Sequence, residues 1–497
     1  MKRLFFILLL FTHTITAQIR RDAVWCFGDS ALVDFNQTPP QLDYCATRCR
    51  GSACSIADSS GNLLFYTHTY YYPLWQTGYL RLGVVWNRNH EVMENGDSLI
   101  GDGWYKEMVI VPDPSDSLQY YLFHTDVTIN GQIYYSKIDL HYNNGLGKVT
   151  QKNTLLDSLN GNKATDGLAA IKHGNGRDWW LIFRTYGGLV NDNTFYKFLI
   201  TPTGISSAIH QNIGQTTWQN AMSLDFNGTG SQMVLTDAVG LIELYDFDRC
   251  TGLLSNWTTI HTETSHPQDS FIAAAFSSND SKLYVSTNDV SMSYIYQFNL
   301  TAPNIAGSKT TIATIVFPSE GGFIKLAIDN KIYWSAFYDD GIIPYPDTVY
   351  NQYNMNLSVI NQPNVLGTGC DFQPYSFYLG GHRTYWGMPN NPNYDLVAKG
   401  GSICDTLGLP NVVEENLKNN RISIYPNPAS NSITFFYDTY KLATMSIRIT
   451  DLTGRILLTQ KLESNIVNLQ SIPNGIYALS FYDGSSFLSS MKLTVLH

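Results

Sequence analysis

Residues 55–67 read Ser55-Ile56-Ala57-Asp58-Ser59-Ser60-Gly61-Asn62-Leu63-Leu64-Phe65-Tyr66-Thr67: an apolar run, a tight polar turn and a second run rich in aromatic residues. Asp, Ser and Gly suit the turn, because Gly adopts positive φ without strain and the Asp and Ser side chains hydrogen-bond the local backbone. Two short apolar runs on either side of such a turn predict a β-hairpin.

The same unit recurs along the chain. Similar turns stand at 58–61, 113–116, 174–176, 227–230, 278–280 and 329–330. The second strands that follow them are Leu63–Tyr66, Tyr120–Phe123, Trp179–Ile182, Met233–Leu235, Leu283–Val285 and Ile332–Trp334. Further strands with two-residue alternation follow in several units, and no stretch sustains helical spacing, so the chain is predicted to be all-β.

The spacing of these units predicts a β-propeller. Their first strands begin near Cys54, Glu107, Gly167, Ala221, Phe271 and Phe323, and intervals of roughly 50 residues are typical of propeller blades. A weaker seventh unit begins near Asp371 and runs from Phe372 to Leu379, and the strand-like segment Val24–Phe35 is expected to complete this last blade. We therefore expect seven blades, with six or eight as alternatives. A row of β-sandwich domains is the competing interpretation, but it needs linkers about every 100 residues, and none precedes Asp395.

The composition excludes several classes of protein. The 497 residues carry 31 Lys and Arg against 41 Asp and Glu, a formal charge of −10, and 44% are hydrophobic. Such a chain can bury a large core, so it is not disordered, collagenous or a coiled coil. An acidic protein is also a poor candidate for binding nucleic acid, which requires a basic surface.

The first residues have the layout of a secretory signal peptide. Lys2 and Arg3 precede the apolar run Leu4–Phe11, and Thr12–Ala17 leads to a cleavage point before Gln18. A membrane anchor is the alternative, but it needs about 20 apolar residues. No later segment approaches that length, so we expect no transmembrane segment and a monomeric exported protein.

Seven cysteines fit an oxidising compartment: Cys26, Cys45, Cys49, Cys54, Cys250, Cys370 and Cys404. A disulfide among Cys45, Cys49 and Cys54, or from that group to Cys26, is predicted, and Cys370 with Cys404 is a second candidate pair. A zinc site is disfavoured, because no fourth Cys and no His stands at a ligand spacing. We expect no metal and no cofactor.

Composition shifts divide the chain into a signal peptide at 1–17, a propeller at 18–395, a linker at 396–420 and a small β-sandwich at 421–497. The last region carries Tyr425-Pro426-Asn427-Pro428, Asp451-Leu452-Thr453-Gly454-Arg455 and Ile472-Pro473-Asn474-Gly475-Ile476-Tyr477. In this order they resemble the type A C-terminal sorting domain of proteins exported by the bacterial type IX secretion system. The predicted sorting residues are Tyr425, Pro426, Asn427, Pro428, Asp451, Gly454, Arg455, Pro473, Gly475, Tyr477 and Lys492, although the final strand around Lys492 is less basic than in many members.

This resemblance implies a route. The signal peptide takes the chain to the periplasm, and the terminal domain directs it across the outer membrane through the type IX machinery. That domain is typically cleaved, and the cargo is released or attached to surface lipopolysaccharide. An accessory domain without a sorting role is the alternative. The stretches 55–67, 86–89, 247–252, 357–364 and 387–390 also resemble a recurring propeller cargo of this pathway, from which no activity can be transferred.

No catalytic motif is present: the chain lacks Gly-x-Ser-x-Gly, His-Glu-x-x-His and a phosphate loop, so no catalytic residue is assigned. In a propeller, the segments leading into the inner strands and the loops after the second strands share one rim. The candidate ligand-binding residues on that rim are His68, Tyr70, Tyr71, Trp75, Lys106, Asp126, Asp166, Tyr186, Asp269, Glu320, Tyr338 and Tyr345. This mostly acidic mouth favours a cationic or polyhydroxyl ligand; a solvated rim with no ligand is the alternative.

Two of these loops are rich in aromatic residues, 70–75 and a long insertion that also holds Tyr350 and Tyr353. Exposed Tyr and Trp suit sugar rings or protein partners, whereas a local lid over the blades is the competing interpretation. The leading hypothesis is a secreted or cell-surface propeller that binds glycans or surface proteins. The alternatives are a polysaccharide hydrolase or lyase that uses rim carboxylates, and a structural surface-layer protein. Two carboxyls about 5–10 Å apart in a deep cleft would favour the enzyme.

Overall fold

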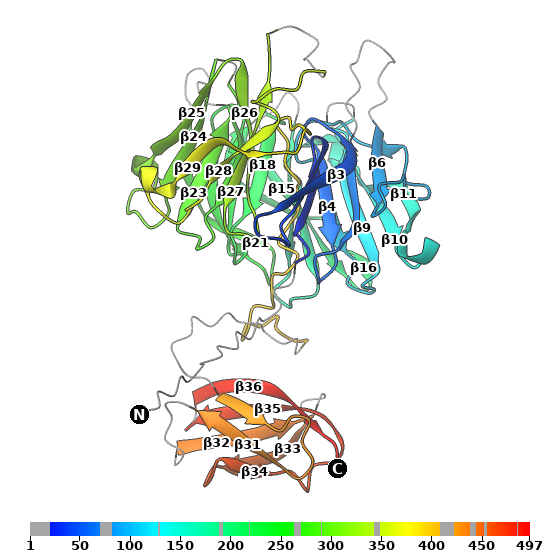
Figure 1. The fold of residues 1–497 in the computed structure, drawn as a ribbon, viewed down its shortest axis with the longest axis vertical. Coiled ribbons are helices and arrows are strands. Elements are labelled where there is room, and N and C mark those ends of the chain that lie inside the picture. Colours follow the sequence, from blue (N-terminus) through cyan, green and yellow to red (C-terminus); the bar gives the residue numbers. More distant parts are fainter. Residues whose placement is uncertain are drawn as a thin grey trace, which may run out of the picture. The chain divides into compact units, whose positions relative to one another are not determined.

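The computed structural model describes residues 20–69, 82–127, 130–187, 192–217, 219–262, 270–289, 291–341, 348–407, 422–437, 444–451, 455–484 and 486–497. The chain divides into two compact units, Met1–Asn411 and Val412–His497 (Figure 1). The predicted signal peptide and most of the predicted linker lie outside the described residues. Within those ranges, no helix is long and apolar enough to cross a membrane.

Seven antiparallel sheets make up the described part of the first unit. Blade 1 consists of β1 (Val24–Phe27), β2 (Asp29–Asp34) and β3 (Gln41–Arg48), and blade 2 of β4 (Ala53–Ala57), β5 (Leu63–Thr69), β6 (Leu82–Asn87) and β7 (Leu99–Ile100). Blade 3 consists of β8 (Met108–Pro112), β9 (Gln119–Thr125), β10 (Ile133–Asp139) and β11 (Lys148–Asp157). Blade 4 consists of β12 (Lys163–Ala164), β13 (Ala169–Lys172), β14 (Trp179–Tyr186), β15 (Asp192–Thr201), β16 (Gly204–Ile205) and β17 (Ile209–Thr217). Blade 5 consists of β18 (Met222–Phe226), β19 (Gln232–Asp237), β20 (Ile242–Asp248) and β21 (Leu253–His261). Blade 6 consists of β22 (Phe271–Phe276), β23 (Lys282–Thr287), β24 (Met292–Asn299) and β25 (Thr310–Val316). Blade 7 consists of β26 (Ser319–Leu326), β27 (Ile332–Tyr338), β28 (Asn356–Ile360) and β29 (Phe372–Tyr378). Short 3-10 helices lie at Asn143–Gly145, Leu159–Gly161, Ala306–Ser308 and Gly367–Cys370.

All six predicted hairpins are confirmed: β4–β5, β8–β9, β13–β14, β18–β19, β22–β23 and β26–β27. The inner strands lie side by side, with β1 against β4, β18 against β22 and β22 against β26. We define the upper rim as the end at which β4, β8, β13, β18, β22 and β26 begin, and the lower rim as the end at which they finish.

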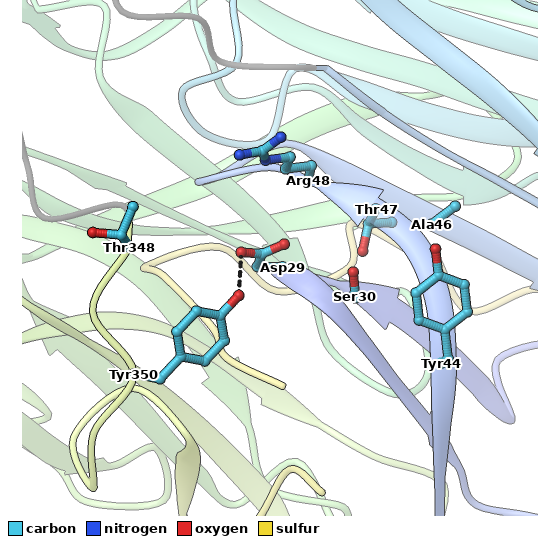
Figure 2. Close-up of a pocket in the computed structure, with 8 residues that line it drawn as sticks. All are labelled: Asp29, Ser30, Tyr44, Ala46, Thr47, Arg48, Thr348 and Tyr350. Atoms are coloured by element: carbon cyan, nitrogen blue, oxygen red, sulfur yellow. Dashed lines mark hydrogen bonds between the residues drawn. The ribbon is translucent and has the colours of Figure 1, made fainter. Parts of the chain in front are cut away.

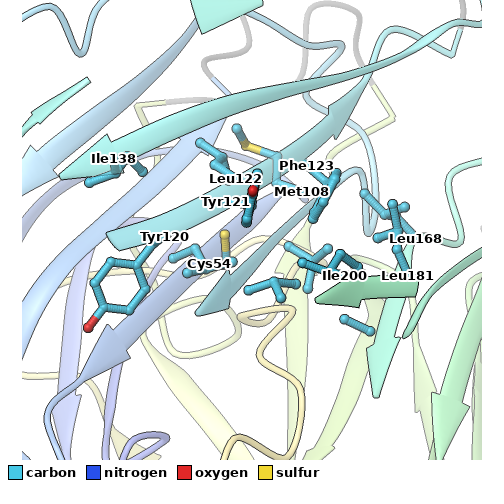
Figure 3. Close-up of a cluster of buried hydrophobic side chains, with 14 of the residues drawn as sticks. Cys54, Met108, Tyr120, Tyr121, Leu122, Phe123, Ile138, Leu168, Leu181 and Ile200 are labelled. Atoms are coloured by element: carbon cyan, nitrogen blue, oxygen red, sulfur yellow. The ribbon is translucent and has the colours of Figure 1, made fainter. Parts of the chain in front are cut away.

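Buried apolar clusters join each blade to the next around a closed ring. One cluster spans blades 2, 3 and 4 (Figure 3), and others join blade 4 to 5 and blade 5 to 6. Two more join blades 6, 7 and 1, and blade 1 to 2. The seven sheets therefore form a seven-bladed β-propeller, in which each face of a blade is buried by its neighbour.

Strand β1 shows how the sequence closes this ring. Its side chains alternate between two faces, as in any strand: Trp25 and Phe27 pack with blade 7, whereas Val24 and Cys26 pack with blade 2. The Trp25 ring meets Tyr333 of β27 edge to face, with 5.9 Å between the ring centroids.

One part of the predicted blade assignment is wrong. Residues 372–378 do not begin a seventh unit; they form β29, the outer strand of blade 7, which pairs with β28. The opening segment does not complete that blade either, because β1 and β2 pair with β3 in a sheet of their own. The ring centroid of Phe377 of β29 lies 5.3 Å from that of Tyr333, so the apolar side of β29 packs, half-buried, against the core of blade 7.

After blade 7 the chain passes along the axis of the ring; we call residues 384–399 the strap. Near the upper rim, its Gly387 N–H donates to the Arg50 carbonyl (2.9 Å) and its Asn390 N–H to the Ala53 carbonyl (2.8 Å). At the lower rim, the Lys399 N–H donates to the Gly174 carbonyl (2.7 Å). The chain's own segment therefore occupies the centre of the ring.

A disulfide joins Cys250 to Cys404, just beyond the strap. The predicted pairings are thus wrong, and Cys26, Cys45, Cys49, Cys54 and Cys370 are buried with free thiols. They are divided among separate cores: Cys26 and Cys45 lie between blades 1 and 2, Cys54 lies among blades 2 to 4, and Cys49 and Cys370 lie in the cluster of blades 6, 7 and 1. No group of three or more His, Cys, Asp or Glu side chains in the described ranges is arranged to hold a metal ion.

Glycine at position 51 is required where the strap, blade 2 and the Trp104 loop meet. A Cβ at Gly51 would lie 1.2 Å from the Trp104 carbonyl oxygen, a backbone atom that cannot move aside cheaply. We expect Gly51→Ala to destabilise the propeller by about 3 kcal/mol or more, as overpacking at its severe end does. Gly228→Ala, whose Cβ would meet only the Asp280 carboxylate at 3.3 Å, is the control. Equal urea midpoints for both variants would contradict the prediction.

The second unit contains two sheets in its described residues. The first has β30 (Ile422–Tyr425), β31 (Ser432–Tyr437) and β34 (Ile466–Asn468), and the second has β32 (Met445–Thr450), β33 (Ile456–Lys461), β35 (Gly475–Asp483) and β36 (Ser486–Val495). A separate apolar core that includes Ile433, Ile447 and Leu479 joins them. This is the small β-sandwich that the sequence predicts.

Candidate functional site

Several predicted rim residues meet in a carboxyl cluster between blades 3 and 4. Asp126 follows β9, Asp166 precedes β13 and Tyr186 ends β14, so all three lie at the upper rim. All three interact electrostatically with Asp102, and Asp166 interacts with Glu107 as well. The sequence argument missed Asp102 and Glu107 as site residues, although Glu107 stands directly before β8.

Glu107 organises the loop above it. Its carboxylate accepts hydrogen bonds from the backbone N–H groups of Asp102 (3.0 Å), Gly103 (2.8 Å) and Trp104 (2.8 Å). Burial, with a further contribution from Asp102, raises the pKa of Glu107 to about 8. Burial and the Glu107 carboxylate hold the pKa of Asp166 well above its ordinary value. Glu107 and Asp166 are both buried, so their raised pKa values favour the protonated, uncharged carboxyl group inside the protein.

Lys106 and Glu320 also point into the protein. Lys106 is buried, forms an ion pair with Asp225 of β18 and lies 5.9 Å from the Phe323 ring. Burial, with Asp339 adding to it, raises the pKa of Glu320 to about 7. The Asn288 side chain donates to the Glu320 carboxylate at 3.2 Å.

His68 lies on β5 of blade 2 and is buried where this strand meets Arg48 of blade 1. The Trp86 indole N–H donates to its Nδ1 (3.3 Å), and the two rings lie parallel with 6.3 Å between centroids. Burial lowers the pKa of His68 to about 3, so it is neutral at physiological pH. Five of the predicted residues, Tyr70, Tyr71, Trp75, Asp269 and Tyr345, lie outside the described residues. As ligand-binding residues, all twelve rim positions stay a prediction.

The insertion of blade 7 forms an aromatic row. Tyr338 stacks on Tyr353 with 6.4 Å between centroids, and Tyr353 meets the edge of Tyr375 at 5.6 Å. Tyr338 belongs to β27 and Tyr375 to β29, so the row joins one ring of the insertion, Tyr353, to two strands of the blade. Tyr350 differs, because 47% of its surface is exposed and its hydroxyl donates to Asp29 of blade 1 at 2.8 Å.

Beside Tyr350 opens a cavity of about 460 Å³, which we call the Asp29 pocket (Figure 2). Tyr350 and Tyr44 stand on opposite sides of it, with Asp29 between them (Figure 2). Tyr44 is 48% exposed. The lining residues are Asp29, Ser30, Tyr44, Ala46, Thr47, Arg48, Thr348 and Tyr350.

Local backbone geometry shapes the pocket floor. Ser30 has φ of +68° and lies at a register shift between Asp29 and Ala31, where it stands opposite the three β3 residues Cys45–Thr47, so the extra residues of this β-bulge belong to β3. Bulges re-aim side chains, often beside functional sites. Arg383 holds the Asp29 carboxylate in place, because Arg383 Nη2 and Nε donate hydrogen bonds to Asp29 Oδ2 at 3.0 and 3.1 Å. The Arg383 guanidinium also lies 4.5 Å from the Tyr350 ring centroid, which holds this tyrosine in place.

The sequence argument named Tyr350 but missed Asp29, Ser30, Tyr44 and Arg48. Asp29 and Ser30 belong to the segment Val24–Phe35, predicted only as a strand that completes the last blade, whereas Tyr44 and Arg48 lie beyond it on β3. Tyr44, which is exposed on an edge strand, was the one feature that could have indicated a site at this position.

In the second unit, the sorting motifs make turns and clamps. The Asn427 side chain donates to the Lys492 carbonyl (2.7 Å) and accepts from the Thr494 N–H (2.9 Å), which ties the Tyr425–Pro428 segment to β36. Asp451 and Arg455 close the turn between β32 and β33, and the Tyr477 hydroxyl donates to the Pro473 carbonyl at 2.8 Å. Tyr425 is 71% exposed, and Gly454 lies outside the described residues.

The two units thus define a β-propeller followed by a small β-sandwich with exposed motif residues. Residues 423–495 match the family model of the secretion system C-terminal sorting domain. The second unit is therefore a sorting domain of the type IX pathway, which indicates export to the cell surface or secretion and an interaction with the type IX machinery.

The solved structures similar to this chain include three with informative descriptions. The periplasmic gluconolactonase PpgL of Pseudomonas aeruginosa has a TM-score of 0.46 and 10% identity over 74% of this chain and 98% of its own. PorZ, a surface component of the type IX secretion system of Porphyromonas gingivalis, has a TM-score of 0.34 and 12% identity over 94% of this chain and 63% of its own. The propeller domain of Cps50 (Swd1) from Myceliophteria thermophila has a TM-score of 0.37 and 11% identity over 66% of this chain and 95% of its own. No curated protein matches the sequence.

Proposed function

We propose that this chain is a type IX cargo protein that crosses the periplasm and the outer membrane, and whose propeller binds a glycan in the Asp29 pocket. The observation that carries the proposal is the pair of half-exposed tyrosines, Tyr44 and Tyr350, on opposite sides of an open polar cavity. Tyrosine rings present rigid apolar faces on which sugar rings stack, and their hydroxyls add hydrogen bonds. Asp29 and Ser30 supply oxygen atoms between the two rings (Figure 2), and polar groups of this kind orient a polyhydroxyl ligand.

A polysaccharide hydrolase or lyase is the alternative, and the site gives it less support. Canonical glycosidases need two carboxyl groups that flank the scissile bond. Of the residues that line the Asp29 pocket, one is a carboxylate, Asp29, and its Oδ2 already accepts hydrogen bonds from Tyr350 and Arg383. Glu107 and Asp166 are buried, so no substrate reaches them in this structure.

The test is a glycan-array screen of the full chain, followed by titration calorimetry with the strongest hit. We expect Tyr44→Ala to weaken binding by about tenfold, because one stacking contact contributes roughly 1–1.5 kcal/mol. Trp257→Ala is the matched control, since Trp257 is 44% exposed on β21 of blade 5, outside the pocket lining. Retention of no carbohydrate, or equal affinity of Tyr44→Ala and wild type, would overturn the proposal.

A further inference from the structure

The strap makes contacts that a simple exit segment would not need. Its Asn390 side chain donates to the carbonyls of Met108 (2.9 Å) and Leu168 (2.8 Å), which belong to blade 3 and to the segment leading into blade 4. The Asn391 side chain bonds Ser55 of blade 2 and Asp22 ahead of β1. Two residues thus connect four blades.

The strap also connects the beginning of the ring to its last blade. The Phe323 N–H of blade 7 donates to the Trp386 carbonyl at 2.6 Å, and Lys325 Nζ donates to the Asn391 carbonyl at 3.1 Å. Before β1, Arg21 forms an ion pair with Asp395 at 2.8 Å. In the described residues, blade 1 and blade 7 have no strand in common. The contacts of the strap therefore help to join the two ends of the ring.

Blade 5 holds the lower end of the strap. The Arg249 guanidinium donates to the Val397 carbonyl (2.6 Å) and, through Nε, to the Lys172 carbonyl of blade 4 (2.8 Å). The next residue, Cys250, is bonded covalently to Cys404. The disulfide closes a loop across 154 residues, and a cross-link of that span restricts the unfolded chain strongly.

We infer that the strap is an internal clasp that closes the propeller ring, and that the Cys250–Cys404 disulfide is a redox-controlled lock that keeps the clasp threaded. The lock forms by thiol–disulfide exchange: the two cysteine thiols are oxidised to one disulfide, and a protein disulfide of the exporting compartment is reduced to two thiols. Because Cys404 lies in the first half of the predicted linker, 396–420, a cut between residues 405 and 421 removes the sorting domain and leaves the clasp locked in the ring. The propeller therefore keeps its closed centre whether or not the sorting domain stays attached.

Hydrogen exchange on the full chain tests the inference. Folded, oxidised protein is compared with the same folded protein after reduction by a phosphine, which takes up the oxygen of water while the disulfide becomes two thiols. The amides of Gly387, Asn390 and Lys399 are expected to exchange at least tenfold faster after reduction, whereas amides of β9 and β14 keep their rates. Cys404→Ser should behave as the reduced protein, and Cys370→Ser, which removes a buried free thiol, as the oxidised one.

Two results would overturn the inference. Unchanged exchange of the strap amides on reduction would show that hydrogen bonds alone hold the clasp. An equal acceleration of β9 and β14 would show that the disulfide supports the whole propeller and is no lock on the strap. Reduction starts from folded protein, so the test stays decisive even if Cys404→Ser does not fold.

Discussion

A chain that ends at Asp405 is expected to unfold cooperatively on heating, whereas a chain that ends at His382 is expected to show no cooperative transition. The difference between them is residues 383–405, which hold Arg383, the strap and Cys404; the strap buries Tyr385, Trp386, Met388, Tyr394 and Leu396. Each large apolar side chain contributes about 1.5–3 kcal/mol when buried, so the strap supplies on the order of 10 kcal/mol. Whole domains are stable by only about 5–15 kcal/mol.

Circular dichroism during heating and size-exclusion chromatography measure this difference. The shorter chain also lacks Cys404, so the chain that ends at Asp405 is heated in reducing buffer as a control for the disulfide. We expect that control to lose some stability but to keep a cooperative transition. A chain ending at His382 that melts within a few degrees of this control would show that the ring closes without the strap.

The hairpins could be predicted from the sequence because their chemistry is local. Asp58 and Gly61 define a turn whatever the rest of the chain does, and the residues on both sides alternate or run apolar as strands do. The choice of partner sheet is not local. Phe372–Tyr378 has the pattern of any strand, and only its pairing with β28 places it at the outer edge of blade 7.

The candidate site could be predicted only in part, for the same reason. The prediction that segments before the inner strands and loops after the second strands share one rim brought Asp126, Asp166 and Tyr186 together, because it depends on topology that the repeats already reveal. It could not show that Glu107 and Asp166 are buried, since the strap that occupies the centre comes from a distant segment, and the neighbouring Trp104 loop folds back through hydrogen bonds to the Glu107 carboxylate. The Asp29 pocket combines the opening strands with an insertion about 320 residues later, and the Cys250–Cys404 pair likewise depends on the path of the strap.

The stability of the propeller is expected to fall as the pH rises from 6.5 to 8. Burial raises the pKa of Glu107 to about 8 and that of Glu320 to about 7, and it holds that of Asp166 well above its ordinary value. In the unfolded chain these carboxyls ionise near pH 4, so in this window the folded state binds more protons than the unfolded state. Stability then decreases with pH, by up to about 1.4 kcal/mol per pH unit for each proton retained.

Buried histidines and lysines act in the opposite direction and offset part of this fall. Burial lowers the pKa of His68 to about 3 and that of His124 to about 4, so their contribution to stability rises with pH until about one pH unit above the ordinary value near 6.5. Burial also lowers the pKa of Lys172 and of Lys197 to about 8, so near pH 8 the folded state loses protons that the unfolded state still binds. The upper limit of pH 8 stays below the ordinary ionisation of the cysteine thiols.

Asp166→Asn isolates one proton of the cluster, because it keeps the shape of the side chain and removes its ionisation. We expect the urea-unfolding free energy of wild type to fall by about 2 kcal/mol or more between pH 6.5 and pH 8, and that of Asp166→Asn to fall clearly less. Glu94→Gln, at an exposed carboxylate that pairs with Lys148 at 2.8 Å, should keep the wild-type slope. If the unfolding free energies of Asp166→Asn and wild type fall in parallel with pH, the proton that the folded state retains is not bound by the Asp166–Glu107 pair, and it resides elsewhere in the propeller.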